Sequence, residues 1–197
     1  MKMRWPAAMA ISLLFSVPAS ADCHSDGVAA IERGATSGPF RFQNQIKIPT
    51  VGSKRITGVV VPPDRAHTIM DDGHEFIQIG RRQWMKTPTD GKWHVLLHSA
   101  LPARLGARGL DRIGSVRCLG EVIDDGRAYL AYEYDEGSGG SPKIPTSSWK
   151  VMTDRATGVP LKFLSRTGDL EEVETRVYEA GLDVDPPVGV GPVSPKR

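Results

Sequence analysis

Two short motifs carry residue types that catalytic or metal sites use. Ser147 and Lys150 have the S-x-x-K spacing of some acyl-transferring serines, a chemistry that needs both side chains on one turn of helix. His94 and His98 are four residues apart and on a helix would share one face, where they could bind a metal ion. Both pairs lie in segments with the pattern of strands, and no glutamate follows His94 as in the zinc proteases. We therefore expect no catalytic site and no metal site, and a hydrolase built on these residues ranks third among the functions considered.

The remaining polar clusters have the composition of turns. Asp71, Asp72, Asp124 and Asp125 could be read as calcium ligands, but each pair is followed by glycine. Aspartate is favoured in tight turns for its geometry alone. The chain contains no phosphate-binding loop, no nucleophile elbow and no dinucleotide-binding glycine motif. The sequence therefore predicts a protein that is not an enzyme and uses no cofactor.

Since the polar motifs predict no catalytic or metal site, apolar side chains are the remaining candidates for a functional site. A strand with one apolar face buries that face on a core or on a ligand. Ordinary core packing is the alternative for each residue, since a core uses the same residue types. The side chains that we expect to line one concave, apolar cavity are Phe40, Phe42, Ile46, Trp84, Trp93, Leu97, Tyr132 and Trp149.

Short strands joined by tight turns must position these side chains. Residues 40–48 alternate apolar and polar side chains with a period of two, as in a strand with one wet face. Similar runs follow, and Asp72-Gly73 and Asp125-Gly126 favour the turns that join antiparallel strands. We count nine or ten strands in hairpin order, with no internal repeat and no regular alternation of strands with helices. A single antiparallel sheet is expected.

Two helical segments accompany the strands. Residues 25–32 could begin a short helix, with Ser25 or Asp26 as its N-cap and Gly34 as its stop. A second helical segment is expected at residues 103–110, midway through the strands. One helix before a long meander and a second one within it indicate a sheet curled around helices.

The first 21 residues have the features of a cleavable secretory signal peptide. Lys2 and Arg4 are followed by an apolar run of about 11 residues, which is short of the roughly 20 that a membrane-spanning helix needs. Ala19-Ser20-Ala21 then fits the A-x-A cleavage pattern. We therefore expect export to the periplasm and cleavage after Ala21.

The only two cysteines, Cys23 and Cys118, follow the predicted cleavage site. In an oxidising compartment an isolated pair usually forms a disulfide, and this one would close a loop of about 95 residues. A redox or metal-binding pair is the alternative, which the absence of C-x-x-C spacing disfavours. Processing as a bacterial lipoprotein would instead put lipid on Cys23, but Asp22 and Ser20 do not match the residues that this cleavage requires.

Removal of 21 of the 197 residues leaves 176, which suits one domain with a core of normal size. The full chain has 25 lysines and arginines against 23 aspartates and glutamates, so loss of Lys2 and Arg4 leaves 23 of each and a net charge of zero. No basic run remains that would suit nucleic acid, and no later segment is apolar enough to span a membrane. The predicted parts are a domain at residues 22–184, a flexible loop at 135–145 within it, and a Pro- and Gly-rich disordered tail at 185–197.

Four spaced pieces of sequence carry a family resemblance. In order they are a strand containing Gly58 that ends at Pro62-Pro63, the segment EFIQIGRRQW at 75–84, a D-x-x-T-G-x-P hairpin at 154–161 and a terminal P-P-x-G-V at 186–190. Together they resemble the periplasmic lipoprotein-localisation factors and their lipid-binding relatives, the LolA/LolB/LppX-like superfamily. The resemblance covers about residues 40–190.

The resemblance implies a mainly β fold with helical insertions, of the α+β class. A single antiparallel sheet would curl into an unclosed half-barrel, with helices covering the concave side and an apolar cavity for acyl chains. In the lipoprotein carriers an arginine stands just before the proline that ends the early strand. Here that position is Pro62 and Arg65 comes later, so general lipid binding is favoured over lipoprotein handover.

The sequence therefore predicts a soluble, non-catalytic periplasmic binding protein for a hydrophobic or lipid-like ligand. Its partner would be a lipid or the acyl chain of a lipoprotein. The alternative is a structural or interaction module of the cell envelope, with a filled core and a protein partner.

Overall fold

Eleven strands and one helix make up the described part of the chain. The structure is a computed structural model that describes residues 22–96, 113–136 and 146–190. The first elements are α1 (Cys23–Thr36), β1 (Phe40–Ile48), β2 (Gly52–Val61), β3 (Arg65–Met70), β4 (Glu75–Ile79), β5 (Arg82–Lys86) and β6 (Trp93–Leu96). The later elements are β7 (Ile113–Asp124), β8 (Arg127–Glu136), β9 (Ser147–Asp154), β10 (Pro160–Thr167) and β11 (Leu170–Tyr178).

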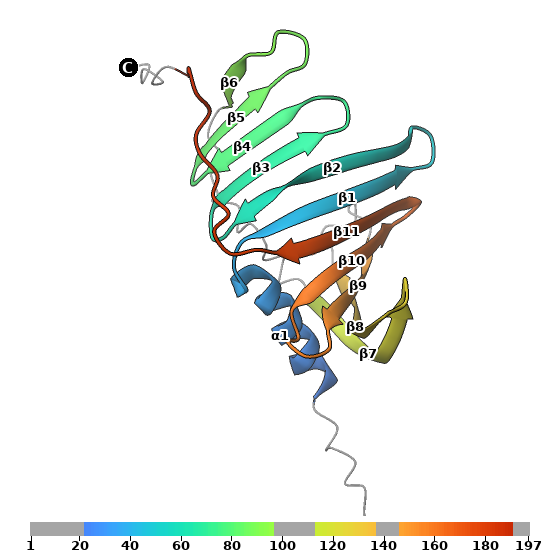
Figure 1. The fold of residues 1–197 in the computed structure, drawn as a ribbon. Coiled ribbons are helices and arrows are strands. Elements are labelled where there is room, and N and C mark those ends of the chain that lie inside the picture. The colour runs from blue at the N-terminus through green and yellow to red at the C-terminus, as the bar shows by residue number, and fades with distance from the viewer. Residues whose placement is uncertain (1–21, 97–112, 137–145, 191–197) are drawn as a thin grey trace, which may run out of the picture.

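All of these strands form one antiparallel sheet, in the order β6-β5-β4-β3-β2-β1-β11-β10-β9-β8-β7 (Figure 1). β1 lies at the centre, where it pairs with β2 on one side and β11 on the other. Within the described residues β6 and β7 are the two edges, so the sheet is not closed. The predicted single antiparallel sheet is confirmed. The count of nine or ten strands is wrong, because each short run between residues 65 and 96 forms a strand of its own.

The aspartate pairs lie at hairpin tips. Asp125 has a φ of 51° and Gly126 a φ of 77°, the left-handed values of a tight two-residue turn between β7 and β8. Asp71 and Asp72 precede Gly73, whose φ is 86°, at the turn between β3 and β4. In the ranges that the structure describes, no group of three or more His, Cys, Asp or Glu side chains could hold a metal ion. Both aspartate pairs precede a glycine with left-handed φ at a hairpin turn, as their composition predicts.

Helix α1 is longer than predicted, and both of its predicted ends are wrong. Asp22 is the N-cap, because its side chain accepts a hydrogen bond from the amide two residues later; the predicted caps Ser25 and Asp26 lie inside the helix. Gly34 does not stop the helix but is buried within it. A Cβ on Gly34 would lie 2.8 Å from the Pro160 ring. Glycine at this position therefore permits close packing of α1 on β10.

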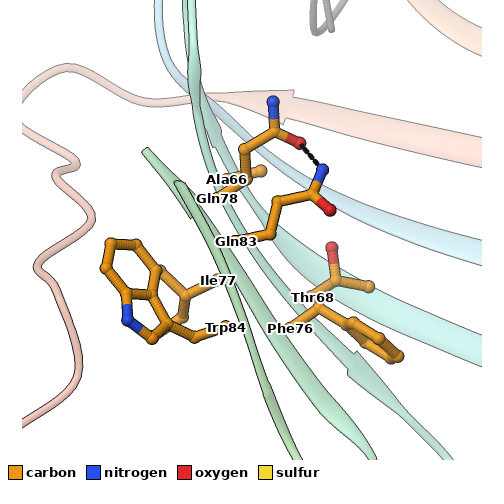
Figure 2. Close-up of a pocket in the computed structure, with 7 residues that line it drawn as sticks. All are labelled: Ala66, Thr68, Phe76, Ile77, Gln78, Gln83 and Trp84. Carbon is orange, nitrogen blue, oxygen red and sulfur yellow. Dashed lines mark hydrogen bonds between the residues drawn. The ribbon is translucent and has the colours of Figure 1, made fainter. Parts of the chain in front are cut away.

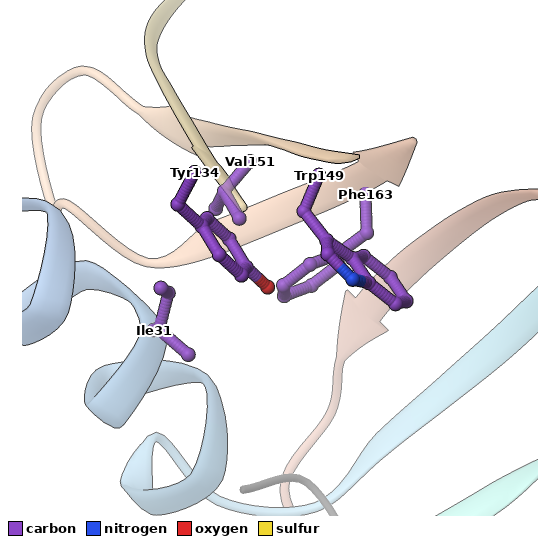
Figure 3. Close-up of a cluster of buried hydrophobic side chains, with 5 residues drawn as sticks. All are labelled: Ile31, Tyr134, Trp149, Val151 and Phe163. Carbon is purple, nitrogen blue, oxygen red and sulfur yellow. The ribbon is translucent and has the colours of Figure 1, made fainter. Parts of the chain in front are cut away.

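One face of α1 packs on the sheet. The buried positions Gly27, Ala30, Ile31 and Gly34 follow the spacing of an apolar helical stripe. Ile31 lies over a cluster of side chains from β8, β9 and β10 (Figure 3). The ring planes of two of them, Tyr134 and Trp149, lie within 8° of parallel, with centroids 6.2 Å apart. The whole cluster comprises Ile31, Tyr134, Trp149, Val151 and Phe163.

A disulfide joins the start of α1 to β7. The bond connects Cys23 and Cys118, whose Cα atoms are 5.7 Å apart, which confirms the predicted pairing. Since the Cys23 sulfur is in a disulfide, it is not available to carry lipid.

The segment that follows β11 crosses the face opposite to α1. Val184 is buried there against Ile77 of β4 and Trp84 of β5. Next to it, Arg65 Nη1 of β3 lies 2.8 Å from the Asp183 carboxylate. Figure 1 shows this segment running from the end of β11 past the ends of β1 to β4. It therefore ties the C-terminal part of the chain to the β2–β6 half of the sheet.

Several predictions fall partly or wholly outside the described residues. The predicted flexible loop at 135–145 begins too early, because β8 extends to Glu136. In the predicted tail, Val190 packs against the cluster around Trp84. No helix among the described residues is long and apolar enough to cross a membrane. The predictions that lie outside the described residues are the signal peptide at 1–21, Leu97, His98, the helix at 103–110, the loop from 137 on and the tail from 191 on.

Candidate ligand-binding face

Cross-strand register assigns each side chain to one face of the sheet, because directly paired residues point to the same side. We call the face that packs against α1 the α1 face; it includes Val151 and Phe163. The register links Phe163 of β10 to Glu174 of β11 and then to Asn44 of β1. It continues outward in the same way through β2 to β6 and, on the other side, through β9 to β8, so alternate residues of these strands can be placed.

The structure divides the predicted cavity residues between the two faces. Trp84 and Trp93 point away from α1, because they pair with Ile77 and Lys86, which lie on the opposite face. Trp84 is only 7% exposed there, in the cluster that Val184 covers. The predicted residues on the α1 face are Phe40, Phe42, Ile46, Tyr132 and Trp149.

Two of these five residues belong to the core beneath α1. Trp149 is buried in the cluster that Ile31 closes. Tyr132 lies so close to the helix that a Cβ on Gly27 would be 3.4 Å from its ring, and burial raises the pKa of its phenol. The helix therefore fills the β7–β10 part of the α1 face with ordinary packing.

A buried ion pair marks the centre of the α1 face. The Arg176 guanidinium lies 4.5 Å from the ring centroid of Phe40 and 4.1 Å from that of Phe163. Its Nε donates to Glu174 Oε1 at 2.6 Å, and its Nη1 donates to the Gly34 carbonyl at 3.3 Å. Arg176 therefore holds the last turn of α1 against the middle of the sheet.

Further polar side chains extend this centre into a band across β1, β10 and β11. Asn44 Nδ2 donates to Glu172 Oε1 at 2.6 Å, and the Ser165 hydroxyl donates to Oε2 of the same carboxylate at 3.3 Å. The Tyr178 hydroxyl donates to the Gly34 carbonyl, and burial raises the pKa of this phenol. The polar band separates the part of the face that α1 fills from the β1–β6 part.

Beyond the polar band, a row of directly paired residues crosses five strands. It consists of Phe42, Gly58, Thr68, Phe76 and Met85, and we call it the apolar row. All five residues are half-buried. A Cβ on Gly58 would lie 2.7 Å from the Phe42 ring and 2.2 Å from a backbone oxygen of β3. Glycine at this position therefore lets the Phe42 ring lie close against β2.

A pocket of about 140 Å³ lies at the β3–β5 end of the row. Within it, Gln83 Nε2 donates to Gln78 Oε1 at 3.1 Å. Figure 2 shows Gln78, Gln83, Thr68 and Phe76 on one side of these strands, with Ile77 and Trp84 on the other. A whole drug-sized ligand needs about 300–1,000 Å³, so this pocket suits only a small part of one.

The serine–lysine motif does not form a catalytic pair. Ser147 lies on the α1 face, two residues before Trp149, and its Oγ is 2.6 Å from Thr167 Oγ1. Lys150 lies on the opposite face, because residues three apart in a strand point to opposite sides. The amine therefore cannot reach the hydroxyl as S-x-x-K chemistry requires.

His94 contacts Asp90 in the turn that precedes β6. Its Nε2 lies 2.6 Å from Asp90 Oδ2. The backbone N–H of Lys92, the Thr87 hydroxyl and the His94 ring lower the pKa of Asp90 to about 2. These contacts organise the hairpin between β5 and β6.

Comparison with known proteins finds solved structures with a similar fold. No protein-family model and no curated protein sequence matches the chain. Among solved structures, the lipoprotein LppX of Mycobacterium tuberculosis superposes with a TM-score of 0.52 at 13% identity, over 80% of this chain and 97% of that one. LprF of Mycobacterium bovis gives a TM-score of 0.52 at 10% identity, over 83% of this chain and 97% of LprF. The chain has a fold similar to those of LppX and LprF.

Sequence reasoning missed the two glutamines that distinguish the β1–β6 half of this LppX-like sheet, Gln78 and Gln83. In β4 and β5 the apolar residues Ile77 and Trp84 alternate with the glutamines. This pattern draws attention to the opposite face and away from Gln78 and Gln83. The signal available in the sequence was the spacing itself, since two glutamines five residues apart across a tight turn pair directly.

Proposed function

We propose that the chain is an exported, non-catalytic binding protein for a hydrophobic or lipid-like ligand held on the β1–β6 half of the α1 face. The observation that carries this proposal is the apolar row, whose half-buried side chains cross five strands on the half of the sheet away from β7 and β10, where α1 packs. The similarity of the fold to those of LppX and LprF supports it. Binding would bury acyl chains, at about 25 cal/mol per Å² of apolar surface.

The proposal includes the cellular location and the processing that the sequence predicts. A signal peptide at residues 1–21 would be removed after Ala21 in the periplasm, and a domain at 22–184 with a tail at 185–197 would remain. The disulfide between Cys23 and Cys118 fits an oxidising compartment. As the resemblance implies, helices would cover the concave side of the sheet, and the ligand would be a lipid or the acyl chain of a lipoprotein.

A protein-docking module is the second candidate, and one observation favours it. β7 is an edge strand of 12 residues, and the Ile123 side chain on it is 74% exposed. An edge strand can pair with an added strand of a partner protein. Amide exchange that slows along β7 when a periplasmic extract is added, with no lipid bound to the purified protein, would favour this candidate.

The ligand-binding proposal is tested with a fluorescent hydrophobic reporter, N-phenyl-1-naphthylamine, on the purified exported protein. Met85→Glu places a carboxylate in the apolar row, and a buried unpaired charge opposes apolar binding. Val95→Glu is the matched control, because Val95 pairs with Trp84 and points to the opposite face of the neighbouring strand. We expect saturable reporter binding that Met85→Glu weakens at least tenfold and Val95→Glu leaves unchanged. No binding by the unmodified protein, or equal loss in both variants, would contradict the proposal.

A further inference from the structure

The pocket at the end of the apolar row is lined by apolar side chains and by three uncharged polar ones, Thr68, Gln78 and Gln83. We propose that it recognises an uncharged, hydroxyl- or amide-bearing group of the ligand, and that Gln83 and Gln78 determine this specificity. This inference rests on the proposed function, because it assigns the polar end of the same lipid-like ligand. It predicts which class of lipid the protein selects.

Two hydrogen bonds fix the orientation of the glutamine amides. Gln83 Nε2 donates to Gln78 Oε1 at 3.1 Å, and Gln78 Nε2 donates to the Gly80 carbonyl at 3.4 Å. An amide that donates through its nitrogen has its oxygen on the other side. Gln83 therefore presents its Oε1 to the pocket together with the Thr68 hydroxyl, and Figure 2 shows both oxygens on the same side of the strands. A ligand hydroxyl could donate to the first oxygen and share a hydrogen bond with the second.

The charged residues of these strands point away from the pocket. Arg65 and Arg82 both pair with Ile79, and Lys86 pairs with Glu75, so all of them lie on the opposite face. The side chains that line the pocket are apolar or uncharged. A phosphate or carboxylate placed here would lose water without gaining a cation, which is strongly unfavourable. The pocket therefore selects against an anionic headgroup.

The size of the pocket fits one small polar group. Its volume of about 140 Å³ is less than half of the roughly 300–1,000 Å³ of a site for a whole drug-sized ligand. Phe76 belongs both to the pocket lining and to the apolar row. A ligand with its hydroxyl in the pocket can therefore lay its acyl chains along the row toward Phe42.

The test compares three probes that share oleoyl chains: dioleoylglycerol with a free hydroxyl, dioleoyl phosphatidic acid with a phosphate, and triolein with neither. Each displaces the fluorescent reporter from the purified protein. We expect dioleoylglycerol to bind at least about tenfold more tightly than phosphatidic acid, because the described residues that line the pocket include no cation. Gln83→Leu should weaken dioleoylglycerol about 2- to 10-fold, the effect of one neutral hydrogen bond, and leave triolein unchanged. Gln43→Leu, which alters an exposed glutamine on the opposite face of β1, should change none of the three.

The outcomes separate this inference from the proposed function. If the reporter and all three probes fail to bind, both are wrong. If the probes bind but phosphatidic acid binds as tightly as dioleoylglycerol, the ligand-binding function stands and the headgroup assignment is wrong. The same conclusion follows if folded Gln83→Leu retains full selectivity. If Gln83→Leu does not fold, the unmodified protein still tests the headgroup assignment, through the ratio of its affinities for dioleoylglycerol and phosphatidic acid.

Discussion

Replacing Arg176 with methionine should strongly destabilise the protein. Methionine keeps much of the length of the side chain and removes the charge, so the change acts on the contacts of the guanidinium. Those contacts are the ion pair with Glu174, the hydrogen bond to the Gly34 carbonyl and the stacking between Phe40 and Phe163. The substitution therefore loosens α1 from the centre of the sheet.

The burial of this pair sets the size of the effect. The side chains of Arg176 and Glu174 are 3% and 9% exposed. Removing one member of a buried ion pair costs about 3–5 kcal/mol, mainly because the remaining charge stays out of water. At about 2–4 °C per kcal/mol for a domain of this size, the melting temperature should fall by roughly 6–20 °C.

Arg41→Met, in the adjacent strand β1, is the matched control. Arg41 Nε lies 2.9 Å from Glu179 Oε2, but these side chains are 56% and 50% exposed. An exposed pair contributes about 0.2–1 kcal/mol. Urea unfolding followed by circular dichroism should give a loss of free energy at least threefold larger for Arg176→Met than for Arg41→Met. Equal losses would refute the conclusion that the buried pair fastens the helix.

Three further perturbations have defined outcomes. Gly58→Ala should lower the unfolding free energy by about 1–3 kcal/mol, since its Cβ would overlap a backbone oxygen of β3; an unchanged urea midpoint would contradict the close packing. The double variant Cys23→Ser with Cys118→Ser should lose about 4–5 kcal/mol in the same assay, the chain-entropy value for a loop of this length, and a loss below about 1 kcal/mol would argue against the bridge. The pKa of Asp90, read by carboxyl NMR, should be about 2 and should rise in Thr87→Ala. Because the folded pKa is depressed, the stabilisation from Asp90 is complete above its unfolded pKa of about 3.8 and is lost as the pH falls through 2; an unshifted pKa would refute the hairpin contacts.

Short sequence patterns predicted the features that depend on neighbouring residues, such as tight turns and single strands. Asp125-Gly126 forms the tight turn that its composition favours, because few residues other than Gly, Asn and Asp adopt left-handed φ values. The alternating pattern of residues 40–48 gave the strand at the centre of the sheet. The pairing of Cys23 with Cys118 followed from their number and from the predicted oxidising compartment.

Features that depend on pairing between distant strands could not be predicted in the same way. In β11 the alternation alone would bury Val173 and Val177, yet Val177 is largely exposed and Glu174 and Arg176 are buried. The register with β1 decides which face is inside, and the aromatic and ionic contacts of Arg176 compensate for its burial. The division of the predicted cavity residues between two faces has the same origin, since register is a property of strand pairs.

Native mass spectrometry of the purified protein tests the central claim most directly. The protein, purified without detergent from the cells that produce it, should carry a bound lipid mass that organic extraction removes. Met85→Glu should carry much less of it, and Val95→Glu should carry as much as the unmodified protein. The extracted lipid should be an uncharged, hydroxyl- or amide-bearing species. A protein that carries no lipid mass, and takes up none when lipid is added, would contradict the account.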